Sequence, residues 1–415
     1  MKRRIYKPAL LIAVLLMFAG RDYAQDTTAV VENQDKDVNV LKCLNLGSIH
    51  LDMHDLNLAM NDMNAGLKEG LGELNMNLRN LGPVLKDLSS NISINLNDDD
   101  LEAKVQRGEI GEKIKNYSKS YPMDANDRLS IENKYGKVVV NTWAKNEVKV
   151  DVQVKSYSND DDDAQKMLNA INISDSKNGD VVSFRTNFGN GGSSIWNLFN
   201  HMNDHHRVEV NYTIYMPAKN GLDISNHYGS TEIPDFDGKV NVDGAYGSLS
   251  AGTLTHPGNR ISVRYGSASI EGLSSADVDM SYGSLSLGSV DKINGDFRYG
   301  SMKIGKIRNS ANIDAHYAGT LQVDELDKNF SNLSVNCSYS TVKIGMNNAA
   351  NADFDITVRY GGFDFGDVPV EITQKTPPDD SKGWKPTKNY KGHIGKGSSD
   401  RMINISTNYG SVKFE

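Results

Sequence analysis

The sequence predicts an all-β fold made of stacked repeats, a β-solenoid, and a recurring phrase carries this prediction. Tyr-Gly-Ser followed by a short apolar strand stands at Tyr246, Tyr265, Tyr282 and Tyr299. Weaker copies stand at Tyr135, Tyr228, Tyr317, Tyr339, Tyr360 and Tyr409. From Tyr228 to Tyr360 successive tyrosines are 17 to 22 residues apart. Self-similarity at a nearly fixed period of about 20 residues is typical of folds that stack repeats along one axis.

The spacing of the apolar residues around each tyrosine is the second observation that predicts this fold. They lie two and four positions before it and three and five after it, as Ile261, Val263, Ala268 and Ile270 do around Tyr265. Each half alternates with period two, so each half is predicted to be a strand with one buried face. The step of three across Gly-Ser interrupts the alternation and indicates a corner, where we expect the glycine to supply unusual backbone angles.

The tyrosines themselves share the phase of the buried residues. We therefore expect an inward aromatic ladder that stacks along the axis; the alternative is an outward ladder that is available to sugars. The expected ladder consists of Tyr228, Tyr246, Tyr265, Tyr282, Tyr299, Tyr317, Tyr339, Tyr360 and Tyr409.

Residues 1–24 have the pattern of a secretory signal peptide. Lys2, Arg3, Arg4 and Lys7 precede an apolar run, and cleavage after Ala24 fits the pattern. The run is too short for an ordinary membrane span, and no later stretch of about 20 apolar residues exists. We expect an exported protein of the periplasm, the cell surface or the medium that is not an integral membrane protein.

Residues 25–115 are predicted to be helical and partly disordered. Apolar residues step by threes and fours over 60–88, which is helical spacing, although four glycines and Pro83 weaken a helix there. A coiled-coil stalk or partner-binding helix is one interpretation. A helix packed on the solenoid, or a weakly ordered segment, is the other.

Residues 116–415 are predicted to form the solenoid domain. Alternating apolar residues predict strands at 129–140, 148–154, 181–184 and 208–214 before the regular repeats. The acidic run 160–163 precedes a short helical pattern at 164–171, whose dipole it complements. Two loops are expected, at 187–207 and at 377–401, and the segment 403–414 supplies the final strands.

Composition excludes several classes of function. The chain of 415 residues has a net charge of −8, which argues against nucleic-acid binding. Cys43 and Cys337, the two cysteines, form no disulfide framework, and Cys337 has the phase of a core residue. The spacing of His201, His205 and His206 permits two metal ligands, but no Cys and no supporting Glu accompanies them, so no metal site is predicted. No catalytic motif occurs, so no enzyme activity and no cofactor are predicted.

The residues that immediately precede the tyrosines suggest a ligand. The residue before each tyrosine is predicted to face outward, and this set contains no acid although the chain is acidic overall. Stacking would place its basic members, His227, Arg264, Arg298, His316 and Arg359, in a stripe suited to a carboxylated or phosphorylated glycan. The alternative is a solvated strand face.

These residues resemble the bacterial "putative adhesin" family of β-strand-repeat proteins, which is related to the head domain of putative auto-transporter adhesins. The matching features are the phrase Leu129-Ser-Ile-Glu-Asn-Lys-Tyr-Gly-Lys-Val138, the segment 208–217 and the Tyr-Gly-Ser repeats. The resemblance covers about residues 115–415. It implies a right-handed parallel β-helix on an exported envelope protein, and it carries over no catalytic or binding residues.

Three functions remain open from the sequence. The first is a non-enzymatic adhesion or surface-binding module of the cell envelope, with a surface glycan or an envelope protein as its partner. The second is a periplasmic interaction or sensing scaffold in which the 60–88 segment contacts a membrane partner. The third is a polysaccharide-active enzyme, which would need acids and bases that converge in one cleft.

Overall fold

A computed structural model describes residues 98–189, 206–346, 351–378, 383–395 and 399–415. These residues belong to one compact unit, Leu51–Glu415. The signal peptide, the 60–88 segment, Cys43, Trp196, His201 and His205 lie outside the described residues. Within them no helix is long and apolar enough to cross a membrane.

The described chain is all-β, as predicted, with two short helices, α5 (Asp98–Gln106) and α6 (Asp161–Ala170). The strands before the regular repeats are β1 (Gly111–Pro122), β2 (Arg128–Lys134), β3 (Val138–Thr142), β4 (Glu147–Ser158), β5 (Ile171–Asn178), β6 (Val181–Phe188) and β7 (Arg207–Met216). The repeats contain β8 (Gly221–His227), β9 (Thr231–Ile233), β10 (Val240–Ala245), β11 (Ser248–Leu254), β12 (Asn259–Arg264), β13 (Ser267–His316), β14 (Thr320–Leu326), β15 (Asn332–Ser338), β16 (Thr341–Ile344), β17 (Ala352–Arg359) and β18 (Phe363–Asp364). The chain ends with β19 (Val370–Thr376), β20 (Thr387–Ile394), β21 (Met402–Asn408) and β22 (Ser411–Phe414).

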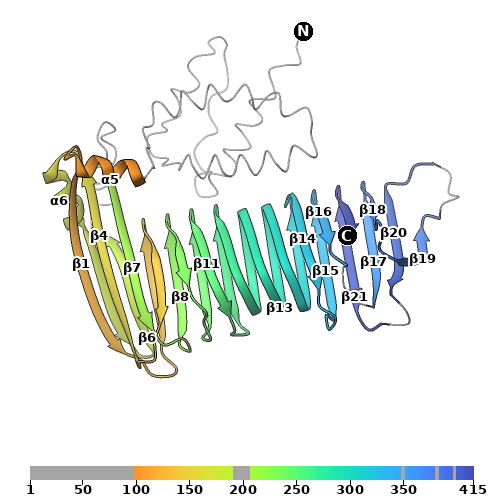
Figure 1. Cartoon of the computed structure of the whole chain (residues 1–415), viewed down its shortest axis with the longest axis horizontal. Helices are drawn as coiled ribbons and strands as arrows, with labels where there is room; N and C mark the ends of the chain where they lie inside the picture. Colours follow the sequence, from red (N-terminus) through yellow and green to blue (C-terminus); the bar gives the residue numbers. More distant parts are fainter. Residues whose placement is uncertain (1–97, 190–205, 347–350, 379–382, 396–398) are drawn as a thin grey trace, which may run out of the picture. The chain divides into compact units, whose positions relative to one another are not determined.

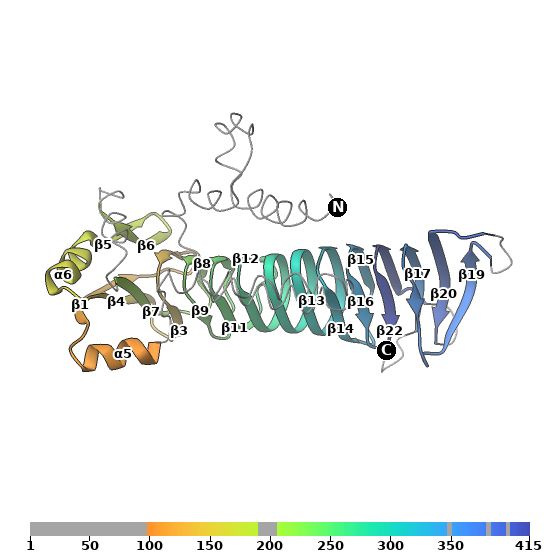
Figure 2. The ribbon, with the colours of Figure 1, turned by 90° about the horizontal axis from the view of Figure 1, so that it is seen from above.

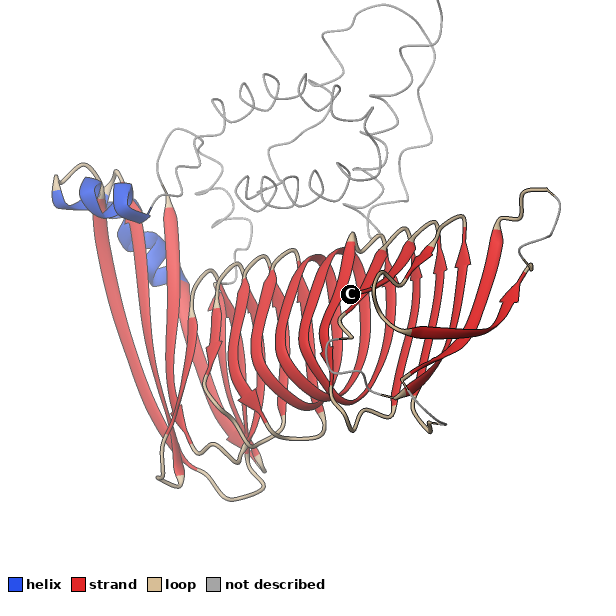
Figure 3. Cartoon of the chain, turned by 45° about the vertical axis from the view of Figure 1, so that its right-hand side comes forward, coloured by secondary structure: helices blue, strands red, loops and turns tan. Residues whose placement is uncertain are grey.

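The strands pair in two arrays that run along the same axis (Figures 1 and 2). The first array contains the strands that precede each tyrosine, with β5 and β6 added at one end and β20 and β19 at the other. Its order is β5-β6-β2-β8-β10-β12-β13-β15-β21-β17-β20-β19. The second holds those that follow it, in the order β1-β4-β7-β3-β9-β11-β13-β14-β16-β22-β18. The long strand β13 belongs to both, since it turns corners at Tyr282 and Tyr299 as it winds between them (Figure 3).

The core lies between the two arrays and confirms the predicted phase. Ile261, Val263, Ala268 and Ile270 are each no more than 2% exposed. Pairing within the regular repeats is parallel, for example Val263 with Met280. Side chains at paired positions of neighbouring strands therefore form columns that run along the stack.

The corner at each tyrosine differs from the expectation in one respect. The tyrosine, and not the glycine after it, takes the positive φ, between 53° and 63° at all ten positions. The glycine is required for close approach instead: a Cβ on Gly266 would lie 1.9 Å from the carbonyl oxygen of Gly247. The corners stack on one another, so a side chain at Gly266 would meet backbone, whereas Ala318 and Ser340 take this position after Tyr317 and Tyr339.

Antiparallel strands close both ends of the stack. At one end β4 pairs with β1 and β7, and at the other β20 pairs with β17 and β19. The edge strand β1 carries Lys113, Lys115 and Lys119, and such charges discourage edge-to-edge pairing with another chain.

One expectation for a single element needs correction. The segment predicted to be helical and partly disordered, 25–115, contains the helix α5 and the first residues of β1, which begins at Gly111. The predicted loop 377–401 contains β20, in which Tyr390, Gly392 and Ile394 are buried on alternate positions. A glycine in the middle of this alternation hides the strand from a count of apolar residues. The other strands predicted before the repeats, and the helix at 164–171, are confirmed.

Candidate binding surface

Ten tyrosines form one continuous stack along the molecule. Neighbouring ring centroids are 4.6 to 5.2 Å apart and the ring planes differ by 3° to 16°. The order is Tyr135, Tyr228, Tyr246, Tyr265, Tyr282, Tyr299, Tyr317, Tyr339, Tyr409 and Tyr360. We call this set the tyrosine ladder. Its spacing matches the distance between hydrogen-bonded strands, so one ring stands on each repeat.

The ladder lies at the surface rather than in the core, which corrects the predicted inward placement. Tyr317, Tyr339 and Tyr409 are 47% to 49% exposed, and none of the ten is fully buried. The positive φ of each tyrosine explains the error, because a left-handed residue leaves the two-residue alternation of its strand. The rings cover one another and keep an edge toward water.

Neighbouring side chains cover both ends of the ladder. The Phe188 ring meets Tyr135 edge-on at 5.6 Å, and the Trp384 ring lies 5.7 Å from Tyr360 at the other end. Trp384 is 76% exposed. Because each inner ring has a tyrosine on both faces, a sugar ring cannot stack on it. The inner ladder offers ring edges and hydroxyl groups, and Trp384 offers an open aromatic face.

Stacking changes the acidity of the ladder. Burial, followed by the neighbouring Tyr265 and Tyr299, raises the pKa of Tyr282 to about 12. Burial also raises the pKa of Tyr135, Tyr228 and Tyr246. These hydroxyls therefore stay protonated at neutral pH and can donate hydrogen bonds.

The residues that precede the tyrosines form a column beside the ladder, in register from strand to strand. Lys134 pairs with His227, His227 with Ala245, Ala245 with Arg264, and Arg264 with Ser281. Further along, His316 pairs with Ser338, Ser338 with Asn408, and Asn408 with Arg359. Arg298 falls between Ser281 and His316, because Tyr299 stacks between Tyr282 and Tyr317. All five basic residues named from the sequence thus share one column.

Aspartates on the same face pair with two of these arginines. Arg264 contacts Asp243 at 2.9 Å and Arg298 contacts Asp296 at 2.7 Å, in pairs that are about half exposed. The residue three positions before the tyrosine is acidic in five repeats, at Glu132, Asp243, Asp279, Asp296 and Asp314. The basic column therefore runs beside an acidic one, a feature that the sequence column alone did not indicate.

The other three members of the column differ in their surroundings. The Arg359 guanidinium lies 5.3 Å from the centroid of the Tyr360 ring, which it faces. His316 Nδ1 lies 2.7 Å from the Ser338 hydroxyl. Burial lowers the pKa of His227 despite the nearby Asp243 carboxylate, 3.9 Å from its Nε2 atom. Arg359 therefore has the most accessible positive charge of the three.

Sequence reasoning missed a partly buried polar cluster where β1 faces β5. The hydroxyls of Tyr117 and Tyr121 both donate to the Asp175 carboxylate. The hydrogen bond to Asp175 and burial raise the pKa of Tyr121 to about 12. This cluster joins β1 to β5, and no alternation in the sequence of β1 reveals it.

No grouping in the described residues suits a metal ion. No set of three or more His, Cys, Asp or Glu side chains lies close enough to hold one there. Cys337 is 3% exposed, as its phase predicts, and burial raises the pKa of its thiol.

Comparison with known proteins gives weak likenesses to solved structures. The chain is similar to a putative cell adhesion protein from Clostridium sporogenes, at 12% identity over 73% of this chain and 99% of that one, with a TM-score of 0.15. It is also similar to a putative adhesin from Parabacteroides distasonis, at 12% identity over 72% and 97%, with a TM-score of 0.28. A putative lipid binding protein from the same organism gives 8% identity over 72% and 96%, again with a TM-score of 0.28.

Two of these names agree with the family that the sequence resembles. At such TM-scores the likeness supports no inference about this chain beyond that agreement. No family model matches the chain, and no curated protein matches it.

Proposed function

We propose that the protein is an exported, non-enzymatic adhesion module of the cell envelope that binds an acidic surface glycan. Residues 116–415 would be the binding domain, wound as a right-handed parallel β-helix, after a signal peptide at 1–24 and a helical segment at 25–115. The parallel pairing of strands one repeat apart supports this architecture.

The observation that carries the proposal is the register of the basic column. Arg264 and Arg298 lie two repeats apart, which is about 10 Å at one strand spacing per repeat. A polymer with regularly spaced carboxylates or phosphates can follow such a column, and the ladder hydroxyls beside it can donate further hydrogen bonds.

The aspartate partners do not prevent this binding. Exposed ion pairs contribute about 1 kcal/mol or less, so an anionic group on the glycan can replace Asp243 or Asp296 at the arginine. The guanidinium presents a planar pair of donors that fits a carboxylate or a phosphate. Because the attraction between the arginines and the glycan acts between exposed charges, which salt screens, binding is expected to weaken as the salt concentration rises.

The test compares two triple variants of the full chain. Arg264→Gln, Arg298→Gln and Arg359→Gln together neutralise the column. Lys239→Gln, Arg260→Gln and Lys328→Gln remove the same charge from exposed positions elsewhere. Polygalacturonate and phosphomannan serve as probes of the carboxylated and phosphorylated classes in a solid-phase binding assay.

The column variant is expected to lose binding and the control variant to retain it. Equal binding of the two variants, or no binding of either probe to the unmodified chain, would contradict the proposal.

A further inference from the structure

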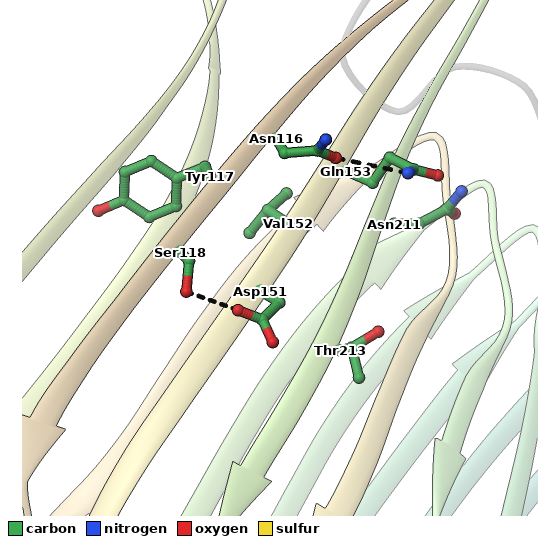
Figure 4. A pocket seen from close by; sticks show the side chains of 8 residues that line it. All are labelled: Asn116, Tyr117, Ser118, Asp151, Val152, Gln153, Asn211 and Thr213. Atoms are coloured by element: carbon green, nitrogen blue, oxygen red, sulfur yellow. Dashed lines mark hydrogen bonds between the residues drawn. The ribbon is translucent and has the colours of Figure 1, made fainter.

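A hollow on the outer face of β1, β4 and β7 is a second candidate site, at the end of the stack where the antiparallel strands lie. Its volume is about 470 Å³. It is separate from the basic column, since β1, β4 and β7 belong to the second array and the column lies on strands of the first. Figure 4 shows the side chains that line it.

Six polar side chains form a grid of two rows across the three strands. Register places Ser118, Asp151 and Thr213 opposite one another in one row. Asn116, Gln153 and Asn211 form the other. Strand spacing and rise give a grid of about 10 Å by 7 Å, which is the scale of a short oligosaccharide rather than of a single ion.

The backbone hydrogen-bonding groups beneath the grid are engaged in pairing between the strands. β4 is paired on one side with β1 and on the other with β7 along this whole segment. An extended peptide recognised through its main chain needs a free strand edge, which the middle of this face does not offer. A ligand here must be recognised by side chains.

Those side chains carry hydroxyl and amide groups, which both donate and accept, and one carboxylate, which accepts. Two of their hydrogen bonds are long, while Ser118 donates to Asp151 at 2.6 Å. Gln153 Nε2 lies 3.4 Å from Asn116 Oδ1. Asn211 Nδ2 is likewise 3.4 Å from Glu209 Oε2. Long hydrogen bonds of this kind are weak, so a ligand hydroxyl can replace them at small cost.

The hollow offers no net charge to an ionic ligand. Asp151 is its one charged lining residue. Burial opposes its ionisation, but hydrogen bonds from Lys149 and Ser118 hold the pKa of Asp151 below its ordinary value. The carboxylate is therefore ionised at neutral pH and is matched by the Lys149 ammonium 2.6 Å away.

An aromatic pair lies beside the grid. Tyr215 is two residues beyond Thr213 on β7 and pairs with Lys149. The Trp143 ring lies 5.5 Å from the Tyr215 ring, and neither ring is fully buried. Apolar C–H faces of a sugar can pack on such rings while its hydroxyls reach the grid.

We propose that this hollow binds an uncharged oligosaccharide, with the six grid residues as hydrogen-bond partners of its hydroxyls and Tyr215 as the flanking aromatic. The proposal does not rest on the acidic-glycan function, because no residue of the basic column takes part.

The test measures binding of maltohexaose, cellohexaose and mannohexaose to the full chain by isothermal titration calorimetry, with gelatin fragments as a peptide probe. A double variant, Asn116→Ala with Gln153→Ala, removes two side-chain amides from the grid. Asn241→Ala with Asn294→Ala makes the same amide deletions on the outer face of the first array.

At least one hexasaccharide is expected to bind, and the grid variant is expected to lose about tenfold in affinity, as for one or two lost hydrogen bonds. The control variant and the triple arginine variant should bind as the unmodified chain does, which separates this site from the basic column. Binding of no hexasaccharide, equal binding by the grid variant, or grid-dependent binding of gelatin alone would overturn the proposal.

Discussion

The ring of Tyr409 stacks on the ring of Tyr339 at 4.9 Å, although Tyr360 comes between them in the sequence. The last repeat, β21 and β22, is inserted between the repeats that contain β15 and β17. On its other face Tyr409 stacks on Tyr360 at 4.6 Å. The C-terminal segment thus joins the last regular repeat to the antiparallel strands that close the stack.

Removing the Tyr409 ring is expected to destabilise the protein. Tyr409→Ala loses two stacked pairs, each contributing about 0.5–1.5 kcal/mol, while the positive φ of 55° remains. We expect the free energy of unfolding to fall by about 1–3 kcal/mol in urea denaturation. Tyr409→Phe keeps the ring and should change the free energy of unfolding little. A similar loss in both variants would show that the hydroxyl, and not stacking, stabilises this position.

The corner glycines should not tolerate a side chain. A Cβ on Gly266 meets the Gly247 carbonyl oxygen at 1.9 Å, so Gly266→Ala is expected to cost about 1–3 kcal/mol or more through forced backbone shifts. Gly244 is a matched control, because its nearest neighbour would be Val263 Cγ2 at 3.6 Å, an ordinary contact. Thermal unfolding of both variants tests this. Equal midpoints for the two would contradict the close stacking of the corners.

Asp127 should make stability sensitive to acid. Its carboxylate is 3% exposed, lies 2.7 Å from Lys177 Nζ and accepts from the Asp124 amide. The hydrogen bond from Lys177, followed by that from Asp124, lowers the pKa of Asp127. A lowered pKa gives stability that is present above the ordinary value of about 3.9 and is lost as the pH falls below it. Between neutral and acidic pH, the free energy of unfolding measured by denaturation should fall less in Asp127→Asn than in the unmodified chain. The same dependence of this free energy on pH in both proteins would refute this role.

The ladder should titrate late in alkali. Because burial raises the pKa of Tyr282 to about 12, the folded protein holds this proton above the ordinary tyrosine pKa of about 10. The associated stability is complete below that pH and is lost as the pH rises toward the folded value. Ultraviolet titration of tyrosinate should show a late phase in the folded protein that shrinks in Tyr282→Phe. A titration that already matches the unfolded chain would contradict the stacked ladder.

Much of the fold could be predicted because the same pattern of apolar residues around a tyrosine recurs in repeat after repeat. The phase of residues such as Val263 and Ile270 fixes which face of a strand is buried, and the tyrosine spacing fixes the repeat. The placement of the ladder could not be predicted from phase, because the left-handed backbone at each tyrosine is a consequence of how the corners stack.

The candidate sites were partly predictable for a related reason. The basic column follows from repeat register, so Arg264 and Arg298 could be aligned by counting. Its pairing with Asp243 and Asp296 required the geometry of neighbouring strands. The grid of the hollow depends on the register of β4 against β7, which are separated in the sequence by α6, β5 and β6. Residues such as Gln153 and Asn211 are recognisable as outward-facing, but not as neighbours.

Protease shaving of intact cells tests the proposed adhesion function most directly. Full-length protein is followed by immunoblot, with a periplasmic protein as the control for an intact outer membrane. The proposal predicts that the protein is degraded while the control survives. Protection of the protein until the outer membrane is opened would place it in the periplasm and contradict adhesion, in favour of an interaction scaffold.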